Sequence, residues 1–136
     1  MDEVNLRSKL KDSKLILGDI SKTSKTFFEE YNPAPIGAVI YDFDFYTSTV
    51  QALKMLENDS KFYLPRVFSY FDNTIGNNKS AFNDFTGERL AINEFNDMNN
   101  LRKICKINQI KKIRIYRNAD YLDQMYYCHI FDSSFR

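Results

Sequence analysis

The sequence predicts an α/β protein with a doubly wound parallel sheet that ends in an antiparallel hairpin. First, residues Ile36 to Tyr41 form an apolar run with the length and β-branched content of a strand covered on both faces. Second, strand-like and helix-like segments alternate on either side of this run. Third, the last part of the chain has the pattern strand, loop, strand, which is typical of a terminal hairpin.

The first half is expected to contain a polar helix, a short strand, an amphipathic helix, the central strand and another helix. Asn32-Pro33-Ala34-Pro35 breaks the second of these helices and leads into the central strand. Thr47, Ser48 and Thr49 are candidate N-caps for the helix that follows the central strand. The expected ranges are 1–13, 14–19, 21–31, 36–41 and 49–57.

The second half is expected to contain a strand, a long helix and two final strands. Pro65 suits the first residue of its strand, where no donor is needed for the ladder. The long helix has apolar residues at a spacing of about 3.6. These apolar residues are Phe82, Phe85, Leu90, Ile92 and Phe95. The expected ranges are 65–71, 80–99, 110–116 and 124–131, with a turn at residues 117–120.

Composition indicates one domain and argues against several classes of partner. The chain has 136 residues, 43% of them hydrophobic, which is enough for one core. A formal net charge of +1 implies no bulk attraction to nucleic acid or to a membrane surface. Cys105 and Cys128 are far apart and lack metal-type spacing, so reduced thiols are expected. With neither a signal peptide nor a membrane-spanning run in the sequence, a soluble cytoplasmic protein is the expectation.

Polar residues follow two of the expected strands. Asp42 and Asp44 come as the central strand ends, and Asp72-Asn73 follows the next strand. Ligands bind at the carboxyl ends of strands in open α/β sheets, so these residues are candidates for chemistry. The structural alternative is that Asp42 and Asp44 end a strand and cap a helix, and that Asp72-Asn73 is an ordinary turn pair.

Other polar and aromatic residues are better explained by packing or solvation. His129, the only histidine, lies in an aromatic strand and is interpreted as a packed residue. Tyr126, Tyr127 and Phe131 are interpreted as core rather than as a stacking platform. The basic residues between Arg102 and Arg117 are interpreted as a solvated face, which makes nucleic-acid binding the weaker alternative. Glu88 and Arg89 are each expected to form helix-surface pairs.

Three segments resemble motifs of the macrocin-type O-methyltransferases, which use S-adenosylmethionine and have a Rossmann-like fold. Residues 42–49 resemble the Asp-x-Asp-x-Tyr-x-Ser-Thr motif, and Phe71-Asp72-Asn73 resembles the Asp-Asp pair that ends the next strand. Residues 87–95 are similar to the Gly-Ala-Arg-x-Ala-Val-x-Glu-Phe helix. The resemblance covers residues 14–136, the C-terminal half of such an enzyme.

The resemblance implies a magnesium site and a methyl-transfer role. Asp42, Asp72 and Asn73 occupy the positions that hold Mg²⁺, which orients a hydroxylated substrate of the sugar or polyketide type. Asp44 is then a base or an outer-shell acceptor, the expected catalytic residue. Asp19 matches the acidic position that contacts the cofactor adenine.

Two departures from the family separate this chain from a complete enzyme. Asn73 replaces a carboxylate, and the glycine-rich turn that cradles the cofactor has no counterpart, because no Gly-x-Gly occurs. The expected domain is therefore a truncated one, residues 1–136, with strands equivalent to 3, 4, 5, 6 and 7 of the order 3-2-1-4-5-7-6.

The truncation leaves two functional alternatives. One is the metal and substrate half of an O-methyltransferase, inactive alone and completed by an N-terminal chain or by a second copy. The other is a non-catalytic fragment or a partner-dependent interaction module. Strand 14–19 would either move beside residues 36–41 or stay loosely attached, and the open edge of the central strand would invite pairing.

Overall fold

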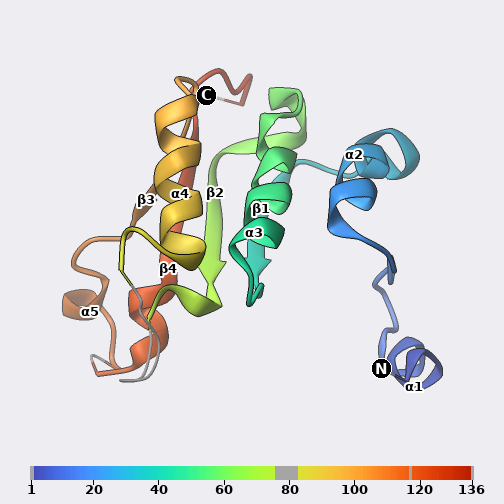
Figure 1. Ribbon diagram of the computed structural model, residues 1–136, viewed down its shortest axis with the longest axis horizontal. Helices are drawn as coiled ribbons and strands as arrows, with labels where there is room; N and C mark the ends of the chain where they lie inside the picture. The colour runs from blue at the N-terminus through green and yellow to red at the C-terminus, as the bar shows by residue number, and fades with distance from the viewer. Residues whose placement is uncertain (1, 76–82, 117, 136) are drawn as a thin grey trace.

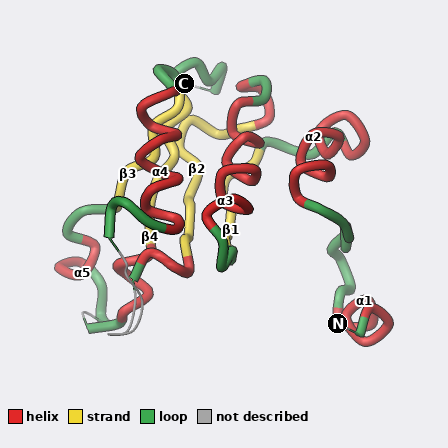
Figure 2. Tube along the Cα trace, viewed as in Figure 1, coloured by secondary structure: helices red, strands yellow, loops and turns green. Residues whose placement is uncertain are grey.

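The protein forms a mixed four-stranded sheet with helices packed against one side of it (Figures 1 and 2). This computed structural model describes residues 2–75, 83–116 and 118–135. The strands are β1 (Ile36–Tyr41), β2 (Tyr63–Phe71), β3 (Arg102–Lys106) and β4 (Met125–Ile130). The α-helices are α1 (Glu3–Lys9), α2 (Ile20–Tyr31), α3 (Tyr46–Leu53), α4 (Gly87–Met98) and α5 (Ile110–Ile113). Four short 3₁₀ segments are η1 (Lys54–Glu57), η2 (Ser60–Phe62), η3 (Asp72–Thr74) and η4 (Asp120–Gln124).

The strand order is β1-β2-β4-β3, so the last strand in sequence lies between its two predecessors. β1 and β2 are parallel, whereas β4 is antiparallel to both β2 and β3. This confirms an α/β fold with a terminal antiparallel hairpin. The expected doubly wound parallel sheet was wrong, because the described strands form a mixed sheet in which β1 and β2 are the one parallel pair. β1 is an edge strand.

The core lies between the sheet and the helices α3 and α4. One face of the sheet contributes buried side chains from β2 and β4, while α4 contributes Ala91, Ile92 and Phe95. Tyr41 of β1 stacks on Phe71 of β2 with ring centroids 4.5 Å apart. α1 contributes no buried residue, and Figure 1 shows it standing away from the body of the molecule.

Three expected strands agree with the structure, and two expected strands do not form. Residues 14–17 have no regular structure and pair with none of the four strands, so the expected strand 14–19 was wrong. The expected strand 110–116 was also wrong, because residues 110–113 form the short helix α5. The penultimate strand is instead β3, with Ile104 buried at its centre.

Arg102 explains why β3 was missed. Its side chain is only 6% exposed, and its Nε donates to the Leu56 carbonyl at 3.0 Å. Its guanidinium also forms an ion pair with Asp132 and a 3.3 Å hydrogen bond to the Asn58 carbonyl. A buried Arg with several partners satisfies its charge, whereas in the sequence it looked like part of a solvated basic face.

The helix boundaries also differ from the expected ones. α3 begins at Tyr46, its N-cap is Phe45, and no side chain caps it, so the expected capping by Thr47, Ser48 or Thr49 was wrong. Thr49 is buried instead and donates its hydroxyl to the Phe45 carbonyl within the helix at 3.2 Å. α4 begins only at Gly87, and Phe85 is 82% exposed rather than on an apolar helix face. Phe82 lies outside the described residues.

Among the helices in the described ranges, none combines the length and the apolar character that crossing a bilayer requires.

Candidate functional site

The parallel pairing of β1 and β2 brings their polar carboxyl ends together. Tyr41 and Phe71 are register partners, so the residues that follow them, Asp42 and Asp72, leave adjacent strands at the same level. Both are exposed. The Asn73 side chain joins the two ends, because its Nδ2 donates to the Phe43 carbonyl at 3.1 Å. The structure therefore brings Asp42, Asp72 and Asn73 to one edge of the sheet, as the sequence predicted.

Tyr70 and Gln124 hold Asp72 in place. The Tyr70 hydroxyl lies 3.0 Å from Asp72 Oδ1 and 2.7 Å from Gln124 Oε1, and its single proton serves one acceptor at a time. Gln124, which is buried in η4, donates Nε2 to the Asp72 carbonyl. Burial is the main reason that the pKa of Tyr70 is raised, and Asp72 and the charges of Asp42 and Glu88 add to this effect.

Glu88 also lies at the strand ends, although its place in the sequence did not indicate this. It lies in the first turn of α4 and is 1% exposed, with Oε2 accepting the Asn73 backbone N–H at 2.8 Å. Oε1 is buried and accepts no hydrogen bond from the described residues. The pKa of Glu88 is raised to about 7, and burial is the main cause. The charges of Asp72 and Asp42 add to the rise, whereas the backbone groups of Asn73 and Phe43 oppose it.

The interpretation of Glu88 as half of a helix-surface pair was therefore wrong. Arg89 pairs instead with Asp84, at 2.5 Å between Nη2 and Oδ1. One sequence signal was present: the acid directly after Gly87 stands at a helix N-terminus, where a negative charge is favourable. Gly87 has a φ of +57°, which is a left-handed conformation. This turn directs the chain into α4.

The donor chemistry at the strand ends fits a hard cation. Two carboxylates and an amide oxygen are oxygen ligands of the kind Mg²⁺ takes together with water. Asn73 uses its Nδ2 to donate to the Phe43 carbonyl, and its Oδ1 accepts no hydrogen bond from the described residues. In the described part of the chain, no three or more His, Cys, Asp or Glu side chains are grouped so as to hold a metal. Glu88 thus does not complete a three-carboxylate site.

Asp44 and Asp19 are placed differently from these residues. Asp44 is exposed at a bend just before α3. Asp19 is the N-cap of α2, where its side chain accepts the Ser21 backbone N–H at 2.9 Å. This hydrogen bond lowers the pKa of Asp19. In the structure Asp19 therefore caps its own helix.

A hydrogen bond links two of the segments that carry the resemblance. The Tyr46 hydroxyl at the start of α3 donates to Glu94 Oε2 of α4 at 2.5 Å. This bond is the main reason that the pKa of Tyr46 is raised. Because α3 follows β1 and α4 follows β2, the bond fixes the two helices that continue from the strand ends.

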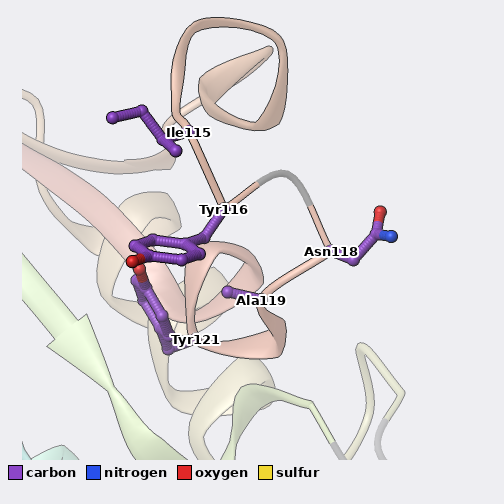
Figure 3. A pocket seen from close by; sticks show the side chains of 5 residues that line it. All are labelled: Ile115, Tyr116, Asn118, Ala119 and Tyr121. Atoms are coloured by element: carbon purple, nitrogen blue, oxygen red, sulfur yellow. The ribbon is translucent and has the colours of Figure 1, made fainter.

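A surface hollow of about 660 Å³ lies on the loop between α5 and η4 (Figure 3). Its lining is apolar and aromatic, with the rings of Tyr116 and Tyr121 beside one another. The lining residues are Ile115, Tyr116, Asn118, Ala119 and Tyr121. Gln124, the η4 residue that contacts Asp72, follows Tyr121 by three residues and does not line this hollow.

Comparison with known proteins finds no relatives. No family model, no curated protein and no solved structure matches this chain.

Proposed function

We propose that this chain is the cation- and substrate-binding half of a Rossmann-like, S-adenosylmethionine-dependent O-methyltransferase domain. The convergence of Asp42, Asp72 and Asn73 at the carboxyl ends of two adjacent parallel strands is the observation that carries the proposal. The strand order β1-β2-β4-β3 supports it, since it corresponds to 4-5-7-6 of that fold.

In this proposal Asp42, Asp72 and Asn73 hold Mg²⁺. Held there, a Mg²⁺ ion would supply a lowered pKa for a substrate hydroxyl at neutral pH. Tyr70 and Gln124 orient Asp72. Asp44, two residues after Asp42, is proposed as an outer acceptor or a base.

The cofactor-binding strands are proposed to lie outside these 136 residues. No Gly-x-Gly turn occurs in this sequence, and Asp19, the residue expected to contact adenine, caps α2. The chain alone is therefore expected to show no saturable binding of S-adenosylmethionine. Saturable binding of the cofactor by the purified chain would count against a divided domain.

Titration with Mg²⁺ tests the proposal directly. Calorimetry and amide chemical shifts should show one site with a dissociation constant of about 1 mM, because two carboxylates and an amide are a weak set of ligands. The variant Asp42→Asn/Asp72→Asn should lose the site, and Asp97→Asn, an exposed acid of α4, should keep it. Equal Mg²⁺ binding by both variants would refute the cation site, and so would unchanged amide chemical shifts at the ends of β1 and β2.

A non-catalytic interaction module is the second candidate. It is favoured by a different feature, the uncovered face of the sheet.

A further inference from the structure

A thiol and an imidazole lie next to each other on the face of the sheet opposite to α3 and α4 (Figure 1). Cys105 of β3 is the register partner of Tyr127 of β4, and its Sγ lies 3.4 Å from Nε2 of His129, two residues further along β4. These side chains alternate with the buried Ile104 and Cys128, so they belong to the other face of the sheet, which we call the open face. Cys105 is an exposed free thiol, so reagents in solution can reach it.

Aromatic neighbours hold the imidazole beside the thiol. The His129 ring stacks on Phe131 with centroids 5.7 Å apart and 7° between the ring planes. The Tyr127 ring lies 6.2 Å from the His129 ring, centroid to centroid. When the ring proton is on Nδ1, Nε2 is free to accept a hydrogen bond from the Cys105 thiol. A nucleophile within reach of a base that other groups orient is the arrangement found in activated thiols.

The thiol depends on this base for its reactivity. Burial raises the pKa of the Cys105 thiol. The thiolate is the nucleophile, so a thiol with a raised pKa reacts slowly at neutral pH unless a neighbour takes its proton. An imidazole exchanges protons near neutral pH, and His129 is within hydrogen-bond distance.

Positive charge lies beside the pair. His129 has Arg66 of β2 as its register partner on one side and Lys103 of β3 on the other. Lys103 donates its Nζ to the Asn96 carbonyl, whereas Arg66 is exposed and forms no ion pair within the described ranges. The four described strands contain neither Asp nor Glu. The open face therefore favours an anionic reactant.

The second thiol of the chain provides an internal reference. Cys128 is 0% exposed, and burial is the main reason that its pKa is raised to about 12. A buried thiol of this kind is inert. Fast reaction of the folded chain with a thiol reagent therefore reports on Cys105.

We propose that Cys105 is a modification site that undergoes reversible thiol–disulfide exchange with a small anionic disulfide, and that His129 accepts the thiol proton. Cys105 Sγ forms a bond to one sulfur of this disulfide while the original S–S bond breaks. The other sulfur leaves as a thiolate and receives the proton from the imidazolium. Cys105 is thereby oxidised to a mixed disulfide, and the leaving half of the reactant is reduced to a thiol. The site is additional to the proposed function and uses neither the cation nor S-adenosylmethionine.

Oxidised glutathione, a disulfide with a net negative charge, is the first probe. Mass spectrometry of the folded full chain should show the addition of one glutathionyl group, which dithiothreitol then removes. Cys105→Ser should stay unmodified while folded, because Cys128 is buried. No adduct on the folded parent would overturn the proposal, and so would an adduct on Cys105→Ser.

His129→Gln tests the proton acceptor, and circular dichroism checks that this variant folds. Its rate of reaction with dithiobis(nitrobenzoate) at pH 7 should be about tenfold lower than that of the parent, or lower still. The parent rate should level off between pH 7 and pH 8, where imidazole is neutral. The variant rate should keep rising about tenfold per pH unit over this range, because only ionisation of the thiol then supplies the nucleophile. Equal rates, or equal pH profiles, would overturn the role of His129.

Arg66→Gln tests the preference for an anionic reactant. This variant should react about threefold more slowly with the anionic dithiobis(nitrobenzoate), while its rate with the uncharged dithiodipyridine should not change. Arg114→Gln is the matched control, because Arg114 is an exposed arginine at the end of α5, and it should leave both rates unchanged. An equal effect of Arg66→Gln on the two reagents, or none on either, would overturn the anionic class of reactant.

Discussion

At the scale of single residues, Glu88 matters most because its carboxylate is buried next to two other acids. One oxygen has a backbone donor and the other has no partner among the described residues. A buried acid with this environment stays protonated to a higher pH than in the unfolded chain. Its pKa of about 7 against an ordinary 4.5 therefore links folding to pH.

The variant Glu88→Gln should be more stable than the parent at pH 8. The folded chain binds the Glu88 proton more tightly than the unfolded chain does, so the parent loses stability as pH rises from about 4.5 to 7. Gln keeps an acceptor for Asn73 N–H without the buried charge. We expect a gain of roughly 1–3 kcal/mol at pH 8 that shrinks towards pH 5, measured by urea unfolding in EDTA.

Glu30→Gln is the control, because Glu30 is an exposed acid of α2. Its stability should follow the pH dependence of the parent. If Glu88→Gln also keeps the parent's pH dependence, Glu88 does not titrate as its burial implies.

At the scale of elements, the contact between α3 and α4 joins the two helices that follow β1 and β2. α3 follows β1 and α4 follows β2, and the Tyr46–Glu94 hydrogen bond joins the helices directly. The two partners are 48 residues apart, so the bond is a long-range contact between the two helices.

The variant Tyr46→Phe should unfold at a lower urea concentration than the parent, because Glu94 loses the donor that joins it to α3. The loss should be modest, since Glu94 can turn to solvent. Tyr116→Phe, at a 74% exposed position, is the matched control and should leave the midpoint unchanged. Equal midpoints for Tyr46→Phe and the parent would show that this bond does not stabilise the helix pair.

At the scale of the whole molecule, the helices cover one face of the sheet, and the N-terminal segment lies outside the core. α1 has no buried residue, and residues 10–13 connect it to the body without regular structure. The core comes from the four strands, the helices α2 to α4 and η1.

Deletion of residues 1–12 should therefore leave the stability of the sheet unchanged, within about 0.5 kcal/mol in urea unfolding. The expected reason is that this segment buries no side chain in the core. A clear fall in the midpoint would show that α1 packs on the body in solution. Leu53→Ala, which truncates a fully buried side chain, is the positive control and should lower the midpoint.

The sequence by itself determined α2, β1, β2 and β4, because their apolar residues recur with the period of the element they form. It also indicated that Asp42 and Asp72-Asn73 follow the carboxyl ends of two strands, and those ends lie side by side in the sheet. Only the tertiary structure decided that residues 102–106 form β3, because the charge of Arg102 is satisfied by distant partners from Leu56 to Asp132. It likewise decided that residues 14–17 form no strand and that Glu88 is buried at the strand ends. Pairing and burial of this kind depend on neighbours far apart in the chain, which local periodicity does not report.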